Sequence, residues 1–228
     1  MIDLNSATAR WRLDLTADIR LNDLRDDLDW NYGNFPEVPN RHIQIDHPTV
    51  PNQTLSTSAV NLAAIKLHLD MLGSDCKNIL EIGVDEGNKN SISSTRLFID
   101  NKATDALYLG IDINDKEYLN DADKNVHTYQ IDSTSIEKVM QYAYGLGVKS
   151  WDFIYIDGWH SINQVLKEWE YTRWLSPHGI VGVHDTAIHP GPHMFLKYLD
   201  RTKWHVIENA CALENNDYGV GFARLKLY

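Results

Sequence analysis

The chain has 228 residues and carries 32 Asp and Glu residues against 21 Lys and Arg residues, so its formal net charge is -11. Because a surface this acidic repels nucleic-acid backbones and anionic lipid, we expect neither nucleic acid nor a membrane as a partner. Two cysteines, Cys76 and Cys211, are too few for a disulfide framework. The sequence shows no signal peptide and no apolar run of membrane-spanning length, and we expect a soluble, cytoplasmic protein.

The first 55 residues differ in composition from the rest of the chain. They contain four of the seven prolines, at positions 36, 39, 48 and 51. Within them Leu21, Leu24 and Leu28 have helical spacing. We predict that residues 1–55 form an N-terminal extension that caps a main domain over 56–228, with a simple surface arm as the open alternative.

From residue 56 onward, helical patterns alternate with short apolar runs. A helix is predicted over 56–72, with Thr57 or Ser58 as its N-cap and Gly73 at its end. Further helices are predicted over 91–101, 135–146 and 161–175. Strands are predicted over 77–83, 106–112, 126–132, 151–157 and 179–185. This alternation predicts an α/β fold, Rossmann-like, with a mostly parallel sheet and helices on both faces.

The last part of the chain has a different pattern. Two apolar segments, 204–210 and 218–228, are separated by a polar loop around Glu214–Asp217 and not by a helix. The pattern predicts an antiparallel hairpin at the end of the sheet.

Acidic residues stand at the ends of the five predicted strands. Ligands of open α/β sheets bind beyond the carboxyl ends of the strands. A carboxylate there accepts from a ribose hydroxyl or an amine, and a pair of them holds a divalent metal. The residues are Glu81, Asp112, Asp132, Asp157 and Asp185.

A glycine-containing loop follows the first strand. Gly83 and Gly87 flank the acidic pair Asp85 and Glu86, and the loop matches neither G-x-G-x-x-G nor a P-loop. The acidic pair would repel a pyrophosphate but suits a cationic cofactor without phosphate, such as S-adenosylmethionine. Asp112, at the end of the second strand, is where such folds bind the ribose hydroxyls.

These residues together resemble a class I S-adenosylmethionine-dependent methyltransferase over residues 56–228. The segment DGWHSINQVLKEWEYTRWLSPHGIVGVHDT, from Asp157 to Thr186, is similar to small-molecule O-methyltransferases of the catechol and macrolide-sugar types and to cephalosporin-hydroxylase-like proteins. The resemblance implies a seven-stranded sheet whose last strand is inserted, antiparallel, between the fifth and sixth. It also implies a homo-oligomer as one possible assembly.

The resemblance further implies how the cofactor is bound. The first strand and its loop would contact the methionine part, and the second strand the ribose. The loop after the third strand would lie near the adenine, and the fourth strand would end near both cofactor and metal. The residues implied in this order are Glu81, Gly83, Gly87 and Ser91, then Asp112, then Asp132 and Ser133, then Asp157.

The resemblance leaves the metal open. Metal-dependent members carry two aspartates that match Asp157 and Asp185, but Thr186 stands where they have Asn or Asp. His184 could replace it as a ligand, and a histidine ligand favours Mn²⁺, Fe²⁺ or Zn²⁺ over Mg²⁺.

His160 is the candidate general base. It lies three residues after Asp157, where catechol-type enzymes carry a lysine, and histidine titrates near neutrality. Alternatively, His160 caps the following helix or binds Asp157 structurally. His189 and His193 are expected in a loop after the fifth strand that faces the acceptor, and Trp159 could border the acceptor pocket.

The expected function is therefore transfer of a methyl group from S-adenosylmethionine to a hydroxyl of a small molecule, sugar or catechol-like, with or without a divalent metal such as Mg²⁺. A nonenzymatic S-adenosylmethionine-binding module is the alternative from another class. An NAD-dependent oxidoreductase is disfavoured by the missing third glycine and by the terminal hairpin.

Overall fold

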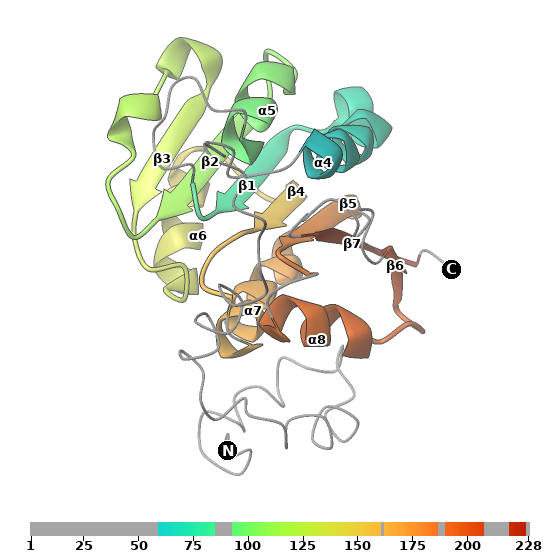
Figure 1. Cartoon of the computed structure of the whole chain (residues 1–228). Helices are drawn as coiled ribbons and strands as arrows, with labels where there is room; N and C mark the ends of the chain where they lie inside the picture. The colour runs from blue at the N-terminus through green and yellow to red at the C-terminus, as the bar shows by residue number, and fades with distance from the viewer. Residues whose placement is uncertain (1–58, 85–92, 161, 187–189, 208–218, 227–228) are drawn as a thin grey trace, which may run out of the picture.

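A computed structural model describes residues 59–84, 93–160, 162–186, 190–207 and 219–226. The predicted N-terminal extension, the proposed N-caps of the first helix, Gly87, Ser91, His189 and Cys211 lie outside these residues. Within the described part, a central sheet is covered by helices on both faces (Figure 1). No described helix is both long enough and apolar enough to cross a membrane.

The sheet has seven strands in the order β3-β2-β1-β4-β5-β7-β6. Strands β1 to β5 pair in parallel, and β7 pairs antiparallel with both β5 and β6. The predicted hairpin and the insertion of its second strand beside the fifth are therefore confirmed. The strands are β1 (Asn78–Ile82), β2 (Leu107–Asp112), β3 (Val126–Gln130), β4 (Trp151–Ile156), β5 (Leu175–His184), β6 (Trp204–Ile207) and β7 (Val220–Leu225).

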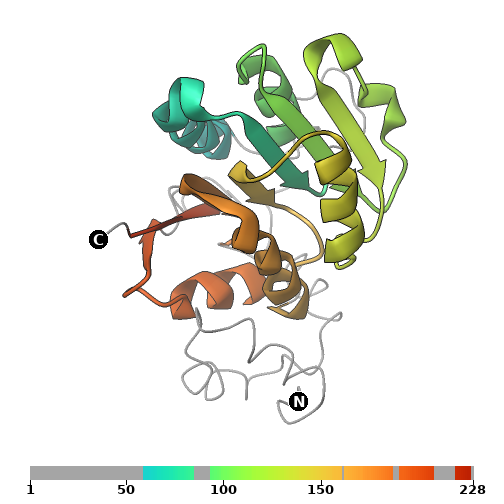
Figure 2. The same cartoon turned by 180° about the vertical axis from the view of Figure 1, so that it is seen from behind.

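Two hydrophobic cores lie on the two faces of the sheet. Helices α4 (Ala59–Leu72) and α5 (Ser94–Asn101) cover one face. The other face is covered by helices α6 (Ile136–Gly145), α7 (Ile162–Glu168) and α8 (Pro190–Tyr198). Figure 2 shows the molecule from the side opposite to Figure 1. Because both faces are covered, the central strands are apolar at consecutive positions, as predicted. Short 3₁₀ segments connect elements: η2 (Gly73–Asp75), η3 (Glu117–Leu119), η4 (Ala122–Lys124) and η5 (Trp169–Trp174).

The structure differs from the prediction after the fourth strand. The helix predicted over 161–175 divides into α7 and η5, and the tighter turns of η5 bury Trp169 and Tyr171 in the core. Strand β5 begins at Leu175, which pairs with Trp151 across a register shift, and not at Gly179.

The segment expected as a loop after the fifth strand contains helix α8. His193 therefore lies in a helix, and the loop assignment was wrong for this residue. The two prolines of the sequence PGPHMF suggested a loop, but proline is well tolerated in the first turn of a helix, where backbone N–H groups have no intrahelical partner.

Candidate functional site

Carboxylate and imidazole groups meet where β4 and β5 end side by side. Ile156 pairs with Val183, so the residues that follow them leave the sheet at the same edge. His184 Nδ1 lies 2.9 Å from Asp157 Oδ1 and 3.0 Å from Asp185 Oδ1. Asp185 has φ 59°, in the left-handed region that non-glycine residues seldom adopt. Such conformations concentrate at functional sites, where surrounding structure holds them in place.

His160 completes this group from the loop after β4. Its Nε2 lies 3.1 Å from Asp185 Oδ2 and 3.4 Å from Asp157 Oδ1. The side chains of His184 and Asp185 are 3% and 9% exposed, whereas those of Asp157 and His160 are 20% and 24% exposed. We call Asp157, His160, His184 and Asp185 the edge cluster; it is closed toward the sheet and open on the outer side.

Electrostatics in the edge cluster favour positive charge. Burial lowers the pKa of His184, but the carboxylates of Asp157 and Asp185 raise it more, and the net pKa lies well above the ordinary value. Burial also lowers the pKa of His160, and Asp185 and then Asp157 outweigh this effect, so the net pKa is raised. The two carboxylates therefore attract a proton or another cation to the space between them.

The edge cluster also has the composition of a divalent-metal site. Ligand atoms of Asp157, His184 and Asp185 all lie within 4.8 Å of one another. Ligands at right angles around a metal with bonds of about 2.0–2.1 Å are about 3 Å apart, which is close to the two His184 distances. Two carboxylates and an imidazole suit Mn²⁺, Fe²⁺ or Zn²⁺ as well as Mg²⁺. These residues therefore fit a divalent cation.

Asn61 supports the edge cluster from α4. Its Nδ2 lies 3.5 Å from His184 Nε2, on the side of the ring away from the carboxylates. When His184 Nδ1 faces a cation, Nε2 carries the proton, so the Asn61 amide, turned to present Oδ1, would accept from this N–H and fix the orientation of the ring. Asn61 could not be predicted from the sequence, because α4 and β5 are far apart in the chain and meet only in the fold.

Thr186 is buried and holds the turn after β5. Its backbone N–H donates to Gly219 O at 3.3 Å, and its carbonyl accepts from His193 Nδ1 at 3.1 Å. His193 thus links α8 to this turn. A ligand role for Thr186 stays a prediction.

Glu81 lies inside the protein, although it was predicted at the methionine part of the cofactor. Its side chain is fully buried, and its oxygens accept from Ser94 Oγ at 2.6 Å, Thr95 Oγ1 at 2.8 Å and the hydroxyl of Tyr108. Burial raises its pKa to about 7. Glu81 therefore fixes the start of α5, the helix that follows the glycine-containing loop.

Gly83 has a packing requirement of its own. It has φ 81°, and a Cβ at this position would lie 1.9 Å from the carbonyl oxygen of Asp157. The Asp157 N–H also donates to Ile82 O at 2.8 Å. Gly83 thus lets the ends of β1 and β4 approach closely, and it lies against the backbone of Asp157 in the edge cluster.

Asp112 joins the ends of β1 and β2. Its Oδ2 accepts from the Val84 N–H at 2.9 Å and its Oδ1 from the Asn114 N–H at 2.7 Å, with Lys116 Nζ 3.9 Å away. A carboxylate has about four acceptor positions, so these contacts leave capacity for ribose hydroxyls.

Asp132 and Ser133 lie in the turn between β3 and α6. Asp132 is exposed, and its Oδ1 accepts from the N–H and the hydroxyl of Thr134, both at 2.8 Å. Ser133 Oγ donates to Glu168 Oε1 at 2.7 Å, and Gln164 Nε2 donates to the same oxygen at 2.9 Å. Both residues lie at the edge of the sheet where the parallel strands have their carboxyl ends, which we call the carboxyl edge. Their contact with the adenine stays a prediction.

Glu168 was missed by the sequence analysis. It is fully buried at the end of α7, and burial raises its pKa to about 7. A Cβ on Gly158 would lie 2.4 Å from Glu168 Oε1, so Glu168 supports both the turn of Ser133 and the loop of the edge cluster. One sequence signal was available: Glu168 stands on the apolar side of its helix, next to Trp169.

Trp159 directly precedes His160 of the edge cluster in the sequence, and it is 59% exposed. An exposed indole beside His160 is consistent with the predicted contact to an acceptor, which stays a prediction. In contrast, Trp169 is buried and packs against Phe195 and Trp204.

Comparison with known proteins identifies the fold. No protein-family model matches the chain, and no curated protein matches its sequence. The methyltransferase MycE of mycinamycin biosynthesis, in complex with Mg, SAH and mycinamycin VI, matches with a TM-score of 0.54 and 16% identity over 83% of this chain and 52% of that chain. An O-methyltransferase from Bacillus cereus in complex with SAH matches with a TM-score of 0.53 and 12% identity over 93% of this chain and 100% of that chain.

At these identities the likeness concerns the fold, and the predicted class I methyltransferase fold is confirmed. The chain spans about half the length of the MycE chains that it matches.

Proposed function

We propose that this protein is an S-adenosylmethionine-dependent O-methyltransferase that acts on a hydroxyl of a small molecule, sugar or catechol-like, and holds a divalent cation at the edge cluster. The observation that carries the proposal is the position of the edge cluster at the carboxyl edge of a methyltransferase fold. The matching structures support it, because MycE contains Mg, SAH and a small-molecule ligand, and the Bacillus cereus enzyme contains SAH.

The cofactor would lie along the ends of β1 to β4. Asp112 would accept from the ribose hydroxyls, Ser133 and Asp132 would border the adenine, and Gly83 would let the methionine part pass close to the backbone. Glu81 would act indirectly in this arrangement, since its carboxylate fastens the start of α5. Gly87 and Ser91 complete the proposed set.

The cation would be held by Asp157, His184 and Asp185, with Asn61 orienting His184. A cation there would lower the proton affinity of the acceptor hydroxyl. This charge would lie beside Gly83, whose backbone is in close contact with that of Asp157.

His160 would receive the proton of the acceptor hydroxyl. Its Nε2 faces the carboxylates of Asp185 and Asp157, so Nδ1 would be the atom that accepts the proton. Asp185 would stabilise the imidazolium that forms, as a carboxylate partner does in other histidine bases. S-adenosylmethionine, when bound, would supply a methyl group already activated by its sulfonium, and the products would be S-adenosylhomocysteine and the methyl ether of the acceptor.

The test is methyl transfer from labelled S-adenosylmethionine to a panel of catechols and sugars, with Mn²⁺, with Mg²⁺ and with a chelator. We expect cation-stimulated transfer that falls about 10²–10⁴-fold in His160→Gln, the usual contribution of a general base. Asp185→Asn should remove the stimulation by cations. His127→Gln, on β3 and distant from the edge cluster, is the matched control and should retain activity. Full cation stimulation in Asp185→Asn would place the metal elsewhere.

A further inference from the structure

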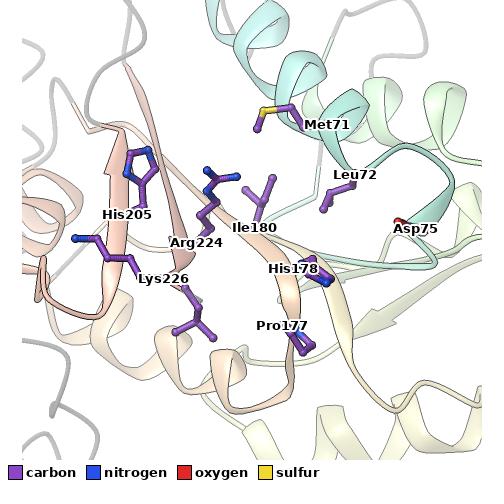
Figure 3. A pocket seen from close by; sticks show the side chains of 10 residues that line it. Met71, Leu72, Asp75, Pro177, His178, Ile180, His205, Arg224 and Lys226 are labelled. Atoms are coloured by element: carbon purple, nitrogen blue, oxygen red, sulfur yellow. The ribbon is translucent and has the colours of Figure 1, made fainter. Parts of the chain in front are cut away.

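A cavity lies away from the edge cluster, between the end of α4 and the strands β5, β7 and β6 (Figure 3). It measures about 700 Å³ and reaches the beginning of β5 at Pro177 and His178. The edge cluster, in contrast, lies where β5 ends. A smaller cavity of about 110 Å³ adjoins it, and both are lined by Met71, Ile180, His205 and Arg224.

The strand register explains why these side chains share one face. Arg224 on β7 pairs with Ile180 on β5 and with His205 on β6. Paired residues of neighbouring strands project to the same side of a sheet. The same face carries Phe222, two residues earlier on β7, which belongs to the core beneath α4.

The lining is basic although the chain is strongly acidic. The larger cavity has the side chains of His178, His205, Arg224 and Lys226, against the single acid Asp75. Lys226 Nζ already donates to Arg201 O at 2.5 Å. Within the part of the chain that the structure describes, no carboxylate lies at ion-pair distance from Arg224, whose side chain extends into the cavity in Figure 3. As far as the described residues are concerned, this guanidinium has no carboxylate partner, and its charge suits an anion in the cavity.

His68 provides an independent sign of a ligand. It is 5% exposed and lines the smaller cavity, and its ring stacks on Phe222 with centroids 3.7 Å apart. Its Nδ1 donates to Ala64 O at 2.8 Å. Its Nε2 is buried, and no described residue forms a hydrogen bond with it.

The protonation state of His68 follows from its surroundings. Burial lowers its pKa, and the charge of Arg224 lowers it further, although the bond to Ala64 has the opposite effect. The ring is therefore neutral near pH 7. Because Nδ1 carries the proton, Nε2 is a buried acceptor that lacks a donor. Unsatisfied buried acceptors are uncommon, and none of the described residues supplies the donor, so a bound molecule with a hydroxyl group suits this position.

We propose that the two cavities together bind a small organic carboxylate that also carries a hydroxyl group. Arg224 would bind the carboxylate, the apolar body would rest on Met71, Ile180 and Phe222, and the hydroxyl would donate to His68 Nε2. The guanidinium matches the two oxygens of a carboxylate. This site is separate from the proposed methyl-transfer site.

The test is isothermal titration of the full chain with 3- and 4-hydroxybenzoate, compared with benzoate and phenol. We expect at least one hydroxybenzoate to bind more tightly than benzoate, which lacks the hydroxyl, and than phenol, which lacks the carboxylate. Arg224→Gln should weaken hydroxybenzoate binding about tenfold or more, the usual effect of losing a charge-assisted hydrogen bond. His68→Phe keeps the ring stacked on Phe222 and should make hydroxybenzoate and benzoate bind equally.

Thermal unfolding of both variants shows whether they remain folded, and Arg224→Gln, at an exposed position, secures the test if His68→Phe is unstable. No binding of either hydroxybenzoate at millimolar concentration would overturn the proposal. So would equal affinity of the wild type and Arg224→Gln. Sedimentation velocity distinguishes the competing occupant: a dimer of the wild type that Arg224→Glu converts to a monomer would show that a second copy covers this face.

Discussion

At the scale of residues, two buried carboxyl groups stand behind the candidate site. Glu81 is held by three hydroxyl groups at the start of α5, and Glu168 by Ser133 and Gln164 beneath two loops of the carboxyl edge. Neither side chain is exposed to solvent. Both therefore act on a ligand through the backbone segments that they fix, and both make stability depend on pH.

Glu168→Gln should change how stability varies with pH. The folded-state pKa of about 7 lies above the ordinary value of 4.5, so the folded protein retains a proton that the unfolded chain releases between these values. The stability from this group is complete below pH 4.5 and is lost as the pH rises to about 7. Chemical denaturation at pH 5 and 7 should show a loss smaller in the variant than in the wild type, by on the order of 1–3 kcal/mol. Exposed Glu137→Gln is the control, and identical pH profiles for all three proteins would contradict the assignment.

Gly83→Ala should destabilise the protein more than Gly147→Ala. Both glycines have positive φ, 81° and 90°, but an added Cβ meets the Asp157 carbonyl at Gly83 and nothing within 4 Å at Gly147. The left-handed conformation costs each alanine about 1–2 kcal/mol. The clash should add about 1–3 kcal/mol at Gly83 alone. Free energies of unfolding from urea denaturation measure the difference, and equal losses would show that β1 and β4 separate without cost.

At the scale of elements, the alternation of apolar runs and helical patterns predicted the sheet and most helices. The departures have local causes. Helix α8 begins with prolines, which signal a loop as readily as a first helical turn, and η5 continues α7 with a tighter turn to bury Trp169 and Tyr171. The periodicity of the sequence predicts neither the start of α8 nor the change from α7 to η5, because both depend on packing against the sheet.

The acidic residues at the strand ends show which features of the site can be predicted from the sequence and which cannot. The five acidic residues all lie at or near the carboxyl ends of their strands, yet their contacts differ. Asp157 and Asp185 meet in the edge cluster, Asp112 and Asp132 bind backbone N–H groups of nearby turns, and Glu81 points into the interior. Position followed from the strand pattern, whereas the direction and partners of each side chain required the fold.

The contact of β6 with the helical layer can be tested with two tryptophans. Trp204 on β6 is 3% exposed and packs edge to face on Trp169, with centroids 5.0 Å apart, whereas Trp159 is 59% exposed. Trp204→Ala should cost about 3–5 kcal/mol of stability. Trp159→Ala should cost less than about 0.5 kcal/mol, and should change the KM for an acceptor if Trp159 borders that pocket. Comparable losses of stability in the two variants would contradict the packing described for β6.

At the scale of the whole molecule, charge is distributed unevenly. The net charge of -11 coexists with a cavity lined by His178, His205, Arg224 and Lys226 at one end of β5. At the other end of β5, two carboxylates draw positive charge to the edge cluster. The average composition predicted exclusion of polyanions, but it could not predict that basic side chains and carboxylates gather at opposite ends of one strand.

Binding of S-adenosylmethionine at the carboxyl edge can be measured by titration calorimetry with S-adenosylhomocysteine, with NAD as the competitor from another class. We predict one S-adenosylhomocysteine bound per chain, affinity about tenfold or more weaker in Asp112→Ala, and no binding of NAD. Binding of NAD without binding of S-adenosylhomocysteine at millimolar concentration would contradict the proposed binding of S-adenosylmethionine.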